Sequence, residues 1–156
     1  MLFALTFVHI LFATLWFGGV VFLNAVVIPA AMKLAPAGQK EIGSHLGQQA
    51  DRFLVPVATL TIIFGVLRGI VAGPITGSTL ASSYGITWLC ALLVAVWLWW
   101  WGTFVIGGIA KRINTASPAE IASLVQRIRL FTMFELLGFA AVFTAMILMG
   151  TDVVRP

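Results

Sequence analysis

The sequence predicts an all-α integral membrane protein, a bundle of four transmembrane helices with both termini facing outward (N-out/C-out). Three observations lead to this fold class. Hydrophobic residues make up 61% of the 156 residues and charged residues only 9%, whereas globular domains carry about 25% charged residues. The stretches between charges reach the ~20 residues that a helix needs to cross a bilayer. Most Lys and Arg residues, in addition, gather in alternate loops.

Four stretches are long and apolar enough to span a membrane. We expect a single domain, residues 1–156, with spans at about residues 2–32, 53–73, 86–109 and 130–150. The charge-free run between Arg68 and Lys111 is too long for one span, and the turn-forming residues GPITGSTLASSYG (73–85) divide it. The opening MLFALTFVHILF lacks the basic region of a signal peptide, so we expect a retained helix.

The orientation follows from the basic residues, which are held on the cytoplasmic side of a membrane. The first and third loops carry Lys33, Lys40, Arg52, Lys111, Arg112, Arg127 and Arg129, and the second loop carries none. Both termini are therefore expected outside a cell inner (plasma) membrane. The net charge of +4 indicates contact with anionic lipid heads rather than with nucleic acid.

Two basic loops have helical character of their own. Ser117, Pro118 and Glu120 have the spacing of a capping box with proline at the first helical position, so a helix is expected to begin there. We interpret this segment, and residues 40–52, as interfacial helices that precede spans four and two. Pro56 is expected to kink span two or to occupy its first turn.

Small residues mark the faces through which the helices are expected to pack. In lipid, helices approach closely where side chains are small. The predicted packing positions are Gly18, Gly19, Gly65, Gly69 and Gly73, with Trp16 beside the first pair.

Polar residues inside the spans are candidates for function, because a charge at the bilayer centre costs about 2.5–3.5 kcal/mol. They are His9, Asn24, Arg68 and Glu135. At 100° per residue, His9, Trp16 and Asn24 share one face of span one. His9 either hydrogen-bonds a neighbouring helix or binds a ligand. Glu135 is a candidate proton-relay or metal group, and we favour an ion pair with a nearby arginine.

Depth along the helices, at about 1.5 Å per residue, separates these residues into two layers. The outer layer contains His9, Arg68, Cys90, Met146 and Met149, and Glu135 lies in the inner layer. Imidazole with soft sulfur ligands suits copper, especially Cu(I), while His9 also suits haem b as an axial ligand and Arg68 a haem propionate. Ordinary packing without any cofactor is the third interpretation.

Two motifs resemble known families. HILFATLWFGG (9–19), with Gly18 and Gly19 following Trp16, and the last helix around Glu135 resemble the membrane region of copper resistance protein D (CopD)-like proteins. That resemblance implies copper handling. The spacing of His9 and Trp16 is also similar to that of HemJ-type membrane protoporphyrinogen oxidases, which implies haem b. However, FLNAVVIPAAM (22–32) departs from that family, as does the absence of a lysine near Trp88.

Three functions therefore remain open at this point. They are copper handling, haem-dependent redox chemistry, and a non-catalytic subunit that packs into a homo-oligomer or a larger membrane complex. The WLWWW run (97–101) places indoles around span three, where they would face lipid, a partner or a cofactor. We find no phosphate-binding loop, nucleophile elbow or paired zinc-ligand motif, so no catalytic residue is assigned.

Overall fold

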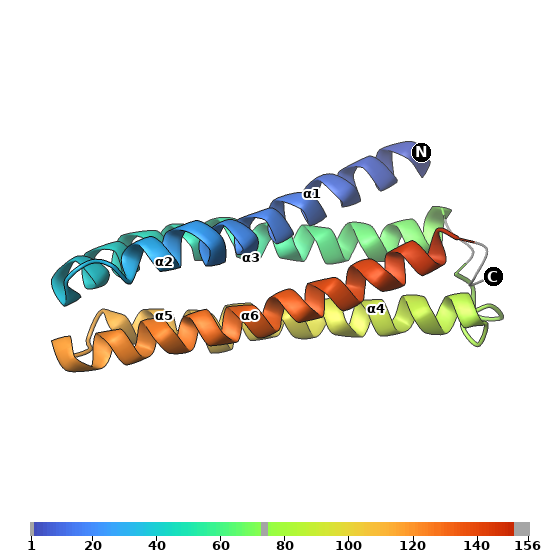
Figure 1. Ribbon diagram of the computed structural model, residues 1–156. Coiled ribbons are helices and arrows are strands. Elements are labelled where there is room, and N and C mark those ends of the chain that lie inside the picture. The colour runs from blue at the N-terminus through green and yellow to red at the C-terminus, as the bar shows by residue number, and fades with distance from the viewer. Residues whose placement is uncertain (1, 73–74, 152–156) are drawn as a thin grey trace.

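The computed structural model describes residues 2–72 and 75–151, and within these ranges the regular structure is entirely helical. Four long helical rods lie side by side (Figure 1), and each is long and apolar enough to cross a membrane. The prediction of an all-α bundle of four such helices is confirmed. The elements, in order, are α1 (Leu2–Phe22), η1 (Leu23–Val27), α2 (Ile28–Ala31), α3 (Pro36–Leu67), η2 (Arg68–Ala72), α4 (Ser83–Trp100), η3 (Trp101–Ile106), α5 (Gly107–Ile113) and α6 (Pro118–Met149).

The second and fourth rods begin much earlier than the apolar segments alone indicate. Residues 40–52, expected as a separate interfacial helix, belong to the unbroken helix α3. The segment after Pro118 is likewise continuous with α6. Pro56 lies in the interior of α3 rather than in its first turn. These two rods therefore begin well before the apolar stretches that identified them.

Local capping explains where two of the rods begin. Ser117 and Glu120 form the predicted capping box at the start of α6, where the Ser117 backbone N–H donates to Glu120 Oε2 at 3.0 Å. The Ser82 hydroxyl accepts a hydrogen bond from the Gly85 N–H at 3.1 Å, which caps α4. The turn-rich segment expected to divide the long uncharged run thus ends at α4. Gly73 lies outside the described residues.

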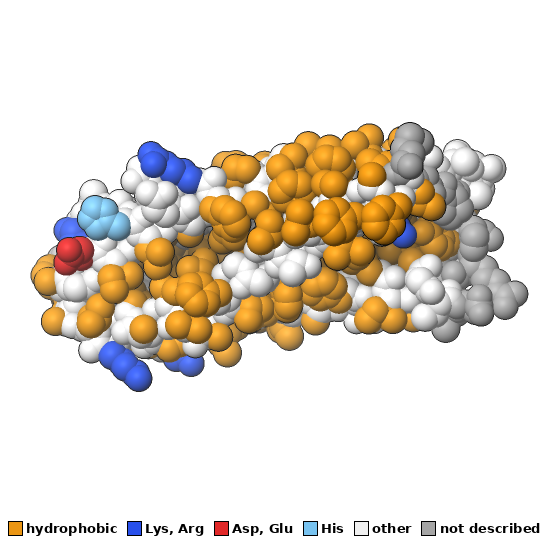
Figure 2. Space-filling model, turned by 90° about the horizontal axis from the view of Figure 1, so that it is seen from above, with side chains coloured by type: hydrophobic (Ala, Val, Ile, Leu, Met, Phe, Trp, Pro, Cys, Tyr) orange, Lys and Arg blue, Asp and Glu red, His pale blue; other side chains and the backbone are white. Residues whose placement is uncertain are grey.

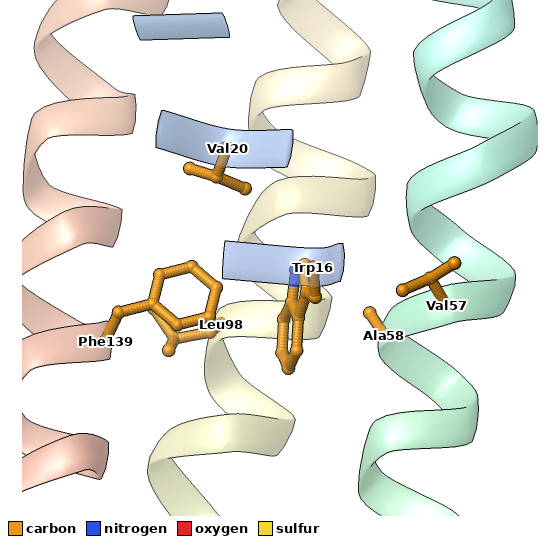
Figure 3. Packing of buried hydrophobic residues seen from close by; sticks show 6 residues of the cluster. All are labelled: Trp16, Val20, Val57, Ala58, Leu98 and Phe139. Atoms are coloured by element: carbon orange, nitrogen blue, oxygen red, sulfur yellow. The ribbon is translucent and has the colours of Figure 1, made fainter. Parts of the chain in front are cut away.

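The bundle consists of two closely packed pairs of rods. The most extensive contacts are between α1 and α3 and between α4 and α6, as Figure 1 also shows. The two pairs meet in a central hydrophobic cluster (Figure 3) formed by Trp16, Val20, Val57, Ala58, Leu98 and Phe139. Trp16 packs edge-to-face on Phe139, with ring centroids 4.9 Å apart, a favourable aromatic geometry.

The exterior is apolar along most of the rods. Phe3 and Leu137 are 83% and 68% exposed, and hydrophobic side chains cover much of the face shown in Figure 2, while most Lys and Arg side chains on this face lie towards one end. That end carries the loops after α2 and α5, and the start of α1 and the end of α6 share the other end (Figure 1). An apolar exterior of this extent needs a covering of lipid or protein.

Candidate metal site and a second cavity

A small cavity lies in the half of the bundle that contains the start of α1. It encloses about 100 Å³, and every rod contributes to its wall. The side chains on this wall that could contact a ligand through a polar atom or a sulfur are His9, Arg68, Trp88, Met146 and Met149. We call this space the outer cavity. It brings together four of the five residues that the sequence assigned to the outer layer.

His9 is held in one orientation by a backbone hydrogen bond. Its Nδ1 lies 3.0 Å from the carbonyl oxygen of Thr61, and since a carbonyl only accepts, Nδ1 carries the proton. In its neutral form, the imidazole then keeps a free lone pair on Nε2. Histidines that bind metals commonly donate their other ring N–H in this way, which fixes the ring.

Two glycines of the second rod make room for side chains of the outer cavity. A Cβ at Gly65 would lie 2.9 Å from His9 Cε1, and a Cβ at Gly69 would lie 2.6 Å from Trp88 Nε1. Gly65 and Gly69, two members of the predicted glycine stripe, therefore face other helices. Because they have no side chain, they admit an imidazole and an indole.

Arg68 places a positive charge on the same cavity. Its Nε donates to the Thr6 hydroxyl at 3.1 Å, so the side chain turns toward α1. Arg68 lines the outer cavity together with His9. The arrangement fits an anionic group on a ligand held near the imidazole.

Cys90 does not join this site. Its side chain is free and exposed, although Trp88, Ala91 and Leu92 line the cavity from the same helix. At about 100° per residue, Cys90 points well away from the direction of Trp88. The predicted set of soft ligands is thereby reduced to His9, Met146 and Met149. The described residues contain no group of three His, Cys, Asp or Glu side chains placed to hold a metal.

Glu135 lies in a second, larger space, the inner cavity, which encloses about 170 Å³. The residue is 4% exposed, and a Cβ at Gly102 would lie 2.9 Å from its Oε1. The prediction of an ion pair with arginine is wrong within the described chain, where the single salt bridge joins Lys111 and Asp51 at 3.9 Å. The arginines of the basic loops, Arg52, Arg112, Arg127 and Arg129, are exposed instead, as expected for long side chains near helix ends that extend to the interface.

Two of the remaining predicted residues, Asn24 and Gly19, contact neighbouring helices, and Gly18 does not. Asn24 Nδ2 donates to the Val20 carbonyl at 3.1 Å, and its Oδ1 accepts from the Thr132 hydroxyl at 2.6 Å, which ties the first rod to α6. Gly19 receives the Leu54 side chain, and Gly18 faces open space.

The tryptophan run divides between the interior and the surface. Trp99 Nε1 donates to the Thr59 hydroxyl at 3.0 Å, and Trp101 Nε1 donates to the Phe131 carbonyl at 3.4 Å. Trp97 and Trp100 are 43% and 47% exposed. Two indoles therefore bind neighbouring helices, and the other two lie on the exterior.

Trp16 and Leu98 line both cavities and stand between them. His45 is exposed and borders a surface groove at the opposite end, so His9 and His45 belong to different spaces.

The sequence did not predict Thr61, Gln39 or the inner cavity as parts of a site, because none of them carries a local motif. Comparison with protein-family models, curated proteins and solved structures finds no match for this chain.

Proposed function

We propose that the chain is a multi-pass protein of the cell inner membrane that binds or passes copper in its outer half. His9, Met146 and Met149 supply the ligands. The observation that carries the proposal is the oriented imidazole, whose Nδ1 is bound to the Thr61 carbonyl at 3.0 Å while the two methionines line the same cavity. The CopD-like sequence marks point in the same direction.

The donor set and the size of the cavity favour copper. Thioether and imidazole together select soft ions such as Cu(I), whereas oxygen-rich sites select Mg²⁺ or Ca²⁺. The outer cavity encloses about 100 Å³, and organic ligands of drug size occupy about 300–1,000 Å³. A single ion fits such a space without rearrangement of the helices, and a porphyrin requires them to separate.

Metal analysis of the purified full-length protein tests this proposal. After loading with Cu(I) and removal of excess metal, we expect about one copper per chain, lost in His9→Ala and reduced in the double variant Met146→Leu, Met149→Leu. His45→Ala is the matched histidine control, and Cys90→Ser tests the thiol that faces away; both should retain copper. A wild-type protein that takes up no copper, or His9→Ala that retains it, would overturn the assignment.

Haem b is the second candidate, and the position of Arg68 favours it. The guanidinium lines the outer cavity with His9, an arrangement that suits a propionate beside an axial imidazole. The HemJ-like spacing of His9 and Trp16 supports the same interpretation. The absorption spectrum of the purified protein separates the two candidates. A Soret band that is lost in His9→Ala would support haem b, and a spectrum without a Soret band would favour the copper proposal.

The proposed orientation places both termini and the outer cavity on the outer side. In a Cys90→Ser background, a membrane-impermeant maleimide added to intact spheroplasts should label Ser78→Cys and leave Lys40→Cys unlabelled. The reverse pattern would mean that the bundle is inserted the other way round.

We also propose that the chain forms a homo-oligomer or joins a larger membrane complex. The exposed indoles of Trp97 and Trp100 support this, because tryptophan is enriched where proteins meet. A non-catalytic accessory subunit is the corresponding functional alternative. Native mass spectrometry in mild detergent should show assemblies larger than one chain, and monomers alone would count against this proposal.

A further inference from the structure

Two buried polar side chains, Glu135 and Gln39, line the inner cavity. Glu135 is 4% exposed and takes part in no ion pair among the described residues. Gln39 is 8% exposed; its Nε2 donates to the Leu34 carbonyl at 2.9 Å, and its Oε1 has no hydrogen-bond partner among the described residues. Buried polar groups normally find a partner, and acidic groups within membrane helices usually pair with a cation or mark a ligand pathway.

The surroundings of Glu135 suit a cation that has an apolar body. The wall is mainly aliphatic and aromatic, and the indoles of Trp16 and Trp99 contribute to it. Thr132 of α6 also lines the cavity, and its hydroxyl already donates a hydrogen bond to Asn24. An ammonium group gains from a tryptophan face within about 6 Å as well as from a carboxylate. The carboxylate thus offers recognition for a positive charge, in a wall to which two indoles contribute.

The inner cavity also has a mouth with its own acidic residue. Asp51 lines both the inner cavity and the surface groove that contains His45 and Lys111. A Cβ at Gly107 would lie 3.5 Å from Asp51 Oδ1, and a Cβ at Gly102 would lie 2.9 Å from Glu135 Oε1. Both carboxyl groups therefore flank η3, with Asp51 toward the surface and Glu135 toward the interior.

We infer that the inner cavity is a binding site for a small organic monocation, an amine that carries one aromatic or short alkyl group. Glu135 pairs with the ammonium inside the cavity, and Asp51, which is bridged to Lys111 at 3.9 Å, marks the mouth. The cavity encloses about 170 Å³, and an apolar cavity of about 150 Å³ holds a benzene ring. An arylalkyl amine therefore matches the space. This site is separate from the outer cavity and does not depend on copper there.

Isothermal titration of the full-length protein in detergent with 2-phenylethylamine tests this inference. We expect saturable binding that weakens at least ten-fold in Glu135→Gln. The variant Glu41→Gln is the matched control, because Glu41 is exposed and does not line the inner cavity. The uncharged analogue 2-phenylethanol should bind at least ten-fold more weakly than the amine.

Gly102→Ala provides a second test that keeps every charge. Its new Cβ would lie 2.9 Å from Glu135 Oε1, so it occupies the space beside the carboxyl and should also weaken amine binding. If Glu135→Gln fails to fold, this variant decides the matter. The absence of saturable binding, equal affinity in these variants and wild type, or equal affinity for the alcohol would each overturn the inference.

Discussion

Substitution of Gly65 by alanine should damage the outer cavity through steric contact with one side chain. The added Cβ would lie 2.9 Å from His9 Cε1 and 3.3 Å from its Nδ1, whereas ordinary contacts begin at 3.4 Å. The ring must therefore withdraw by about 0.5 Å at the closest atom. Because Thr61 lies one turn before Gly65 on the same face, the shift stretches the 3.0 Å bond to the Thr61 carbonyl.

The expected change in stability has two parts of opposite sign. Overpacking of this kind costs about 1–3 kcal/mol, and replacing a helical glycine by alanine contributes up to about 1 kcal/mol of stability. The net effect is a loss of about 1 kcal/mol, which lowers Tm by roughly 2–4 °C for a chain of this size. Copper binding at the proposed site should weaken as well, since the imidazole loses its fixed orientation.

Gly18→Ala is the matched control for this prediction. Nothing lies within 4 Å of a Cβ at Gly18, so this variant gains helix propensity without a clash. Thermal unfolding and copper content, both measured in detergent, should separate the two variants. Equal Tm values and equal copper content in Gly65→Ala and Gly18→Ala would refute the steric reasoning.

Three further substitutions test packing elsewhere in the bundle. Trp16→Ala should lower the free energy of unfolding by about 3–5 kcal/mol, because a large buried aromatic is removed; a loss below ~1 kcal/mol in denaturant titration would contradict the position of Trp16 in the core. Ser117→Ala should lower the free energy of unfolding by about 1 kcal/mol, because the capping box is lost. Hydrogen exchange in the first turn of α6 should become faster, and unchanged exchange would speak against the cap. Trp99→Phe should lower the free energy of unfolding by about 0.5–1.5 kcal/mol, because the hydrogen bond from the indole to Thr59 is lost. Trp97→Phe, at an exposed position, is its control. Similar Tm shifts in the two variants would exclude a role for that bond.

The sequence predicts the four rods well because the hydrophobic runs and the capping motifs are local signals. The capping box at Ser117 and the shared face of His9 and Trp16 depend on residues of a single helix, so helical geometry alone locates them. The orientation of Cys90 relative to His9 requires the rotation of α4 against α1. That rotation is set by packing between helices and leaves no mark in either segment.

The partner of Glu135 was mispredicted for a related reason. Arginines near helix ends have long side chains, and proximity in depth does not decide whether they turn inward. Gln39 and Gly102 were missed because their importance comes from the cavity that they border. Such a cavity exists only where several helices fail to fill the space between them.

The layer formed by Trp16 and Leu98 has a consequence for how the bundle separates its two faces. Leu98 is fully buried and Trp16 is 5% exposed, and both border the outer and inner cavities. One layer of side chains therefore separates the two cavities. Smaller side chains at positions 16 and 98 are expected to join them into one continuous space, so side-chain volume at these positions keeps the interior divided.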